Sequence, residues 1–217
     1  MRRCQISFVG MIVAACAVGQ TNAALVVTGQ TGSLRASGTG GVVTRSAPAL
    51  SPWTESITAG GTDWAGTAST ITSWNADSLE LYGVVNIAPG TGQPEWTSGE
   101  VQVDVDFTFT ETTDTFVRFE FGVGFGETTI TSQFAGHIVD LATGNEVILS
   151  DTFAPTTFAP GNYRISILAN VGNIQANPEL FGETNRTSFG GIYVLPTPGA
   201  VVVLAGGLGA IAGRRRR

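Results

Sequence analysis

The sequence predicts an all-β protein: an antiparallel, jelly-roll-like β-sandwich, with a signal helix at the N-terminus and a short apolar helix at the C-terminus. Charged residues make up only 13% of the chain, whereas 29 of its 217 residues are Gly. Thr and Ser are also abundant, a composition that favours short strands and tight turns over helices. Turn residues recur between short apolar stretches, at a spacing typical of sandwiches.

The clearest strand is expected over residues 101–110, where apolar and polar residues alternate without a break. Because alternate side chains of a strand point to opposite faces, one face of this strand should be buried. The expected core row consists of Val101, Val103, Val105, Phe107 and Phe109. Asp104 and Asp106 then share the opposite face, where we expect them to be solvated.

Other strands follow from β-rich stretches bounded by turn residues. They are expected over residues 24–28, 69–74, 78–87, 115–123, 133–140, 146–153, 163–171 and 188–195. Residues 140–145 resemble a hairpin loop, with Gly144 in a left-handed conformation. We therefore divide the chain into a signal peptide (1–23), a Gly/Thr/Ser-rich leader or edge strands (24–66), a sandwich domain (67–195) and a C-terminal tail (196–217).

The N-terminus has the three parts of a secretory signal peptide. Arg2 and Arg3 precede an apolar stretch over residues 6–18, and small residues follow. We expect cleavage between Ala23 and Ala24, which leaves a mature protein without cysteine. In a second interpretation, Cys16 ends a lipoprotein-like signal and carries a lipid.

The C-terminus combines an extended junction, a short apolar stretch and a basic end. The junction consists of Pro196, Thr197, Pro198 and Gly199, and residues 201–213 that follow it soon after carry no charge. The basic end consists of Arg214, Arg215, Arg216 and Arg217. Arginines resist translocation, so we expect them to stop transfer and to remain cytoplasmic, with the sandwich outside.

This order of parts resembles the PEP-CTERM sorting signal, whose proteins are processed by exosortases. The resemblance is confined to the tail and to the overall layout, and Thr197 stands where that family usually has Glu. It implies an exosortase-like partner, transient anchoring in the inner membrane and a final place on the cell surface or outside the cell. Proteins with this tail often accompany exopolysaccharide production, which makes an extracellular polysaccharide a second implied partner. An ordinary short membrane anchor is the alternative.

The charge of the mature segment argues against nucleic-acid binding. Residues 24–195 hold five Arg, no Lys and 17 acidic residues, a net charge of −12. A nucleic-acid-binding surface needs clustered cations. Acidity alone attracts divalent cations only weakly, and no calcium-loop spacing is present.

No residue pattern predicts catalysis, a cofactor or a metal site. His137 is the only histidine, so a zinc site lacks ligands, and Ser132 and Asp140 are merely near it in sequence. Asp104 and Asp106 could form an acid–base pair, which keeps a glycosidase as the weaker alternative.

The tryptophans support one further alternative, a carbohydrate-binding module. Exposed aromatic rings stack on sugar rings, and the candidates are Trp53, Trp64 and Trp96. Trp74 ends an expected strand and should be buried. The leading prediction is an exported, noncatalytic protein of the cell surface or extracellular matrix.

Overall fold

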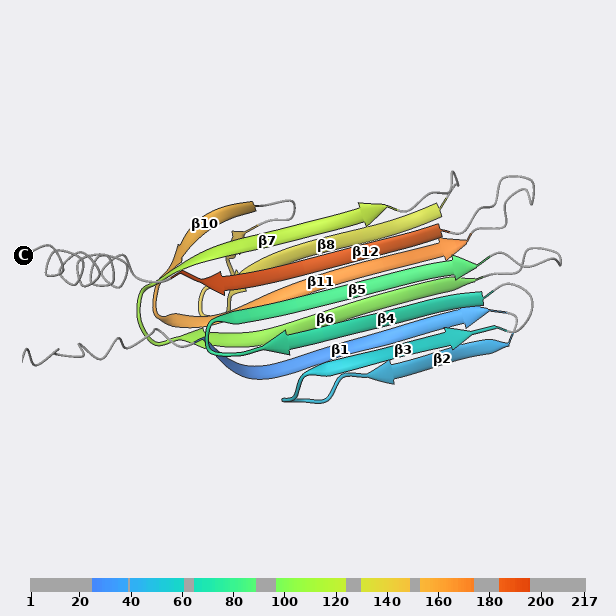
Figure 1. Ribbon diagram of the computed structural model, residues 1–217, viewed down its shortest axis with the longest axis horizontal. Coiled ribbons are helices and arrows are strands. Elements are labelled where there is room, and N and C mark those ends of the chain that lie inside the picture. Colours follow the sequence, from blue (N-terminus) through green and yellow to red (C-terminus); the bar gives the residue numbers. More distant parts are fainter. Residues whose placement is uncertain are drawn as a thin grey trace, which may run out of the picture.

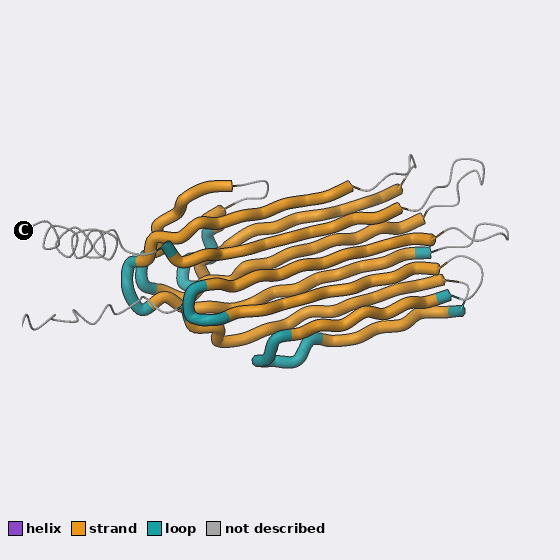
Figure 2. The backbone as a smooth tube through the Cα atoms, viewed as in Figure 1, coloured by secondary structure: helices purple, strands orange, loops and turns teal. Residues whose placement is uncertain are grey.

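The computed structural model describes residues 25–38, 40–60, 65–88, 97–123, 130–148, 153–173 and 184–195. These residues form two six-stranded antiparallel sheets packed face to face, with strands running along the long axis (Figure 1). Figure 2 shows strand through almost all of the described chain, and no described residue is helical. The predicted all-β class and the antiparallel sandwich are confirmed.

Each sheet is built from strands far apart in the sequence. In order, sheet A holds β2 (Gly41–Ser46), β1 (Val26–Gly38), β6 (Ser98–Phe109), β11 (Gly161–Asn173), β8 (Ile130–Asp140) and β9 (Glu146–Ile148). Sheet B holds β10 (Phe153–Phe158), β7 (Thr113–Val123), β12 (Thr184–Val194), β5 (Ser78–Ala88), β4 (Ala65–Trp74) and β3 (Trp53–Ala59). The last two strands, β11 and β12, occupy central positions, between β6 and β8 and between β5 and β7.

The core lies between the sheets and contains the predicted row of β6. Val101, Val103, Val105 and Phe107 are fully buried and Phe109 is 1% exposed. Asp104 and Asp106 lie on the outer face and are partly exposed. The register predicted from alternation is therefore confirmed.

Aromatic rings fill one end of the sandwich. Phe107, Phe109, Phe158 and Tyr163 pack with ring centroids 5.0 to 6.4 Å apart. The Tyr163 hydroxyl donates to the Ala159 carbonyl at 2.9 Å, where the chain crosses from β10 to β11 in the other sheet. This is the geometry of a tyrosine corner, which fixes such a crossing.

The sheets approach each other much more closely at the opposite end. A Cβ on Gly66 of β4 would collide with the backbone carbonyls of Ser98 and Ser37 in sheet A. A Cβ on Gly99 of β6 would likewise collide with Val85 of β5. Glycine is required here because nothing larger fits between the layers.

Both ends of the described chain meet at the aromatic end of the sandwich. The Leu25 amide donates to the Ala76 carbonyl at 3.1 Å, and the Val194 amide donates to the Asp77 carbonyl at 2.8 Å. Both bonds reach the same turn between β4 and β5. We call this the terminal end; β1 starts and β12 finishes there, at the left of Figure 1.

Before residue 67 the structure shows strands, one of the two predicted alternatives, and β2 and β3 lie at the edges of their sheets. Residues 26–59 form β1, β2 and β3, and β1 is an inner strand whose Leu34 is fully buried. The predicted boundary between 66 and 67 falls inside β4. The strand expected over 146–153 is instead two strands in different sheets, β9 and β10.

The hairpin loop is confirmed: Gly144 has φ 72°, and its amide donates to the Asp140 carbonyl at 2.8 Å. The two expected terminal helices lie outside the described residues. Within the described ranges, no helix has the length and apolarity needed to cross a membrane.

Candidate functional site

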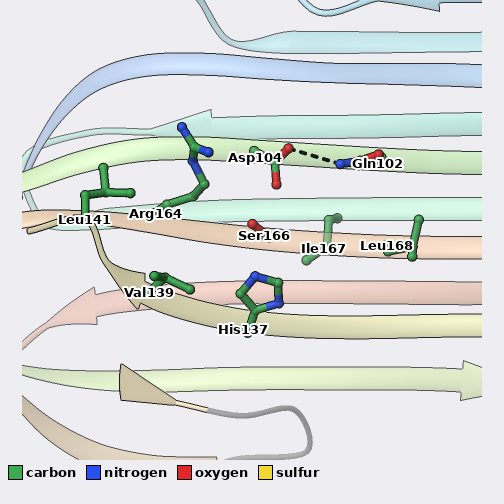
Figure 3. Close-up of a pocket in the computed structure, with 9 residues that line it drawn as sticks. All are labelled: Gln102, Asp104, His137, Val139, Leu141, Arg164, Ser166, Ile167 and Leu168. Atoms are coloured by element: carbon green, nitrogen blue, oxygen red, sulfur yellow. Dashed lines mark hydrogen bonds between the residues drawn. The ribbon is translucent and has the colours of Figure 1, made fainter. Parts of the chain in front are cut away.

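A groove of about 440 Å³ lies on the outer face of sheet A, over β6, β11 and β8 (Figure 3). Its lining residues are Gln102, Asp104, His137, Val139, Leu141, Arg164, Ser166, Ile167 and Leu168. Its volume lies in the range of small-ligand sites. None of its lining residues is Phe, Tyr or Trp.

Strand register brings the polar residues of the groove together. Ser166 of β11 is directly opposite Asp104 of β6 on one side and His137 of β8 on the other. Figure 3 shows the three on neighbouring strands. The next row pairs Arg164 with Asp106 and with Val139. Paired residues 25 to 62 positions apart in sequence thus share one surface.

Arg164 and Asp106 form a bidentate ion pair beside the groove. Arg164 Nε donates to Asp106 Oδ1 at 2.6 Å, and Nη2 donates to Oδ2 at 3.0 Å. The hydrogen bond to Asp106 raises the pKa of the Arg164 guanidinium further above its usual value. Both oxygens of Asp106 are therefore engaged by Arg164. The neighbouring Asp104 accepts a longer bond from Gln102 Nε2, at 3.3 Å (Figure 3).

This arrangement supplies polar contacts but matches neither catalytic template. In a Ser-His-Asp triad the histidine lies between the acid and the serine. Here Ser166 lies between Asp104 and His137. For a glycosidase two carboxyl groups must act on one bond, whereas both oxygens of Asp106 already bind Arg164.

The other candidates near His137 in the sequence are Asp140 and Ser132. The Asp140 carboxylate accepts the Ala142 amide at 2.8 Å and so closes the hairpin loop. The side chain of Ser132 lies outside the described residues. Among the described residues, no three His, Cys, Asp or Glu side chains gather in a way that could hold a metal ion.

Of the three tryptophans proposed as sugar contacts, the structure describes only Trp53. Trp53 is only 6% exposed and belongs to the core, so its ring is closed to a sugar. Trp74 is half-buried and packs against the core. Trp64 and Trp96 lie outside the described residues.

The processing and sorting residues also lie outside the described residues. These are Cys16, Ala23 and Ala24, the junction Pro196, Thr197, Pro198 and Gly199, and Arg214, Arg215, Arg216 and Arg217. Their roles stay predictions.

The sequence prediction missed a group of exposed rings on the outer face of sheet B. Tyr82 lies on β5, Phe189 and Tyr193 lie on β12, and Phe116 lies on β7. The sequence could have shown the face of each ring, because each alternates with a buried neighbour along its strand. Only strand pairing shows that they share one surface.

No family model, no curated protein and no solved structure matches this chain.

Proposed function

We propose that this chain is an exported, noncatalytic protein of the cell surface or extracellular matrix, sorted by a PEP-CTERM-like tail. The signal peptide and the tail carry this proposal at the level of sequence. An exosortase-like enzyme would cut near Pro196 to Gly199, while Arg214 to Arg217 hold the tail at the inner membrane. The finer, jelly-roll description of the sandwich belongs to the same proposal.

The observation that supports display is the position of the two chain ends. Leu25 and Val194 are both bonded to the turn between β4 and β5, at the terminal end. A signal before residue 24 and a tail after residue 195 would therefore join the sandwich at one end. A tail held in the membrane would turn the terminal end toward the bilayer and the glycine-lined end outward.

Two features support a role without catalysis. In the row that contains Asp104 and His137, Ser166 occupies the middle position, which a Ser-His-Asp triad requires for histidine. Both carboxylate oxygens of Asp106, a candidate glycosidase acid, are bound by Arg164. The burial of Trp53 also removes one of the three rings proposed for the sugar-binding alternative.

The export route is tested by changing the four terminal arginines to serine in the full-length gene. We expect the wild-type chain on the cell surface or in the medium, beginning at Ala24 and ending near residues 196–199. The serine variant should lose its hold at the membrane, and uncut precursor should be released.

The measurements are cell fractionation and the mass of the exported chain. A variant with Asp104 changed to Asn is the control, since it alters one charge of the sandwich and leaves both signals intact. A wild-type chain that stays in the cytoplasm would contradict export. Unchanged processing and location of the serine variant would contradict the stop-transfer role, and a lipid on Cys16 would contradict cleavage at Ala23.

A further inference from the structure

The outer face of sheet B carries two rows of partly exposed rings, which we call the aromatic face. Tyr82 of β5 is directly opposite Phe189 of β12, and Tyr193 of β12 is directly opposite Phe116 of β7. Tyr82 is 37% exposed, and the other three rings are partly exposed. The rows are four residues apart on β12, about 13 Å along the strand. The face spans β5, β12 and β7, which are hydrogen-bonded neighbours in sheet B.

Gly191 lets two of these rings lie down on the sheet. It sits midway between Phe189 and Tyr193 on the same face of β12. A Cβ on Gly191 would be 3.0 Å from atoms of the Phe189 ring and 3.0 Å from an atom of the Tyr193 ring. The two rings therefore lean over the space that a side chain would otherwise fill. The result is a flat platform in place of upright side chains.

Polar groups lie between the two rows of rings. Glu80 and Arg118 are directly opposite Gly191, one on each neighbouring strand. The Tyr193 hydroxyl donates to Glu80 Oε1 at 2.9 Å. Arg118 donates through Nε to Glu120 Oε1 at 2.8 Å, and its Cζ is 5.2 Å from the centroid of the Phe189 ring. These contacts hold hydrogen-bonding groups between the two rows, with the Arg118 guanidinium over the face of the Phe189 ring.

We propose that the aromatic face binds a neutral polysaccharide with an extended, flat chain. A sugar ring has apolar C–H faces and a rim of hydroxyl groups. The flat rings of Tyr82 and Tyr193 match the faces, and Glu80 and Arg118 match the hydroxyl groups. A chain laid along β12 would meet both rows.

The charges of the face and of the chain favour a neutral polysaccharide over a protein partner, a nucleic acid or an anionic polymer. The centre of a protein–protein interface is usually depleted of Glu, whereas Glu80 lies in the middle of this face. Residues 24–195 have 17 acidic residues against five Arg, which repels nucleic acids and anionic polymers. A neutral polymer meets no such repulsion.

The test is affinity electrophoresis of the purified full chain in native gels that contain one polymer each. The polymers are hydroxyethylcellulose and galactomannan, which are neutral and extended, dextran as a neutral flexible chain, and alginate as an anionic chain. We expect hydroxyethylcellulose or galactomannan to retard the protein, and alginate to leave its mobility unchanged.

Variants then locate the binding surface. Tyr82→Ala should require at least about ten times more polymer for the same retardation. Tyr82→Phe, which keeps the ring, should be retarded like the wild type. Ile71→Ala is the matched control, because Ile71 is opposite Tyr82, is 48% exposed and has no ring. His137→Ala is the control for the groove of sheet A. Thermal unfolding of each variant checks that the fold is kept.

Three outcomes would overturn the proposal. One is the absence of retardation by both extended neutral polymers. Another is equal weakening by Ile71→Ala and Tyr82→Ala, which would indicate a general apolar contact. The third is a dimer in sedimentation that Tyr82→Ala dissociates, which would assign the face to a second copy. Binding by purified protein does not depend on the export route, so the two proposals fail separately.

Discussion

At the scale of single residues, stability is concentrated in side chains that alternation identifies. The rings of Phe107 and Phe109 are buried on both sides, whereas Asp104 on the same strand lies at the surface. The contrast follows from the two-residue period of the strand. Adjacent positions should therefore respond very differently to substitution.

Phe107→Ala should lower the free energy of unfolding by about 3–5 kcal/mol, because it opens a cavity among packed rings. Asp104→Asn should change it by less than about 0.5 kcal/mol, since this carboxylate lies at the surface with one long hydrogen bond. Chemical denaturation of the two variants measures both values. Similar losses in both would mean that the side of β6 that faces the core has been misassigned.

Tyr193 should make stability depend on pH in the alkaline range. Burial, and next its hydrogen bond to Glu80, raise the pKa of Tyr193 to about 12. In the unfolded chain a tyrosine has a pKa of about 10. The stability that protonated Tyr193 contributes to the folded protein is therefore fully present below about pH 10. It is lost as pH rises through about 12. The absorbance of tyrosinate against pH measures the titration.

Tyr193→Phe is the matched variant, because it keeps the ring and removes the ionisable group. Its stability should fall less steeply than that of the wild type between about pH 10 and 12. Equal slopes would show that Tyr193 ionises as readily in the folded as in the unfolded protein.

At the scale of elements, the sequence predicts strands whose alternation is strong and misses those held by specific contacts. The strand over 101–110 was found with its correct inward face, because five apolar residues mark it. β2 was missed because its side chains are nearly all exposed or half-exposed, so no alternation marks it. β10 was missed because Pro155 interrupts it, a residue tolerated there only because β10 is an edge strand.

The connection between β2 and β3 depends on one buried glutamine. Gln30 of β1 is 4% exposed, and its Nε2 donates to the Pro48 carbonyl at 2.9 Å and the Ser51 carbonyl at 3.2 Å. Its Oε1 accepts from the Thr72 hydroxyl at 2.7 Å. A polar residue in a Gly- and Thr-rich segment gives no sign of this role, which explains the uncertain prediction over 24–66.

Gln30→Leu should therefore destabilise the protein by about 1–3 kcal/mol, because buried polar partners lose their bonds. The loss should be local as well, so limited proteolysis should cut faster near residues 47–52. Gln102→Leu is the control, since Gln102 is an exposed glutamine whose side chain donates a long hydrogen bond, 3.3 Å, to Asp104. Equal protease resistance of Gln30→Leu and wild type would contradict the role of Gln30.

The polar groove and the aromatic face show the same limit of sequence-based prediction, because each site is assembled from several strands. Asp104, His137 and Ser166 can each be found in the sequence, but their common row requires the pairing of β6, β11 and β8. Likewise, Tyr82 and Phe189 become neighbours only through β5 and β12. Alternation predicts the face of one strand and carries no information about which strands are adjacent.

At the scale of the whole molecule, the last strands of the chain complete both sheets. β11 lies between β6 and β8, and β12 lies between β5 and β7. These contacts join residues far apart in sequence, a topology associated with slow folding. Neither sheet is continuous until the C-terminal strands have been added.

The central position of β12 also has a mechanical consequence. This strand leads directly to the tail, is hydrogen-bonded to β5 and β7 along its length, and carries Phe189 and Tyr193. If the tail is anchored in the membrane and a polymer binds to those rings, a pulling force on the polymer is transmitted along β12 to the anchor. That pull would act along β12 and stress its two ladders in shear, so many hydrogen bonds would have to break together rather than one after another.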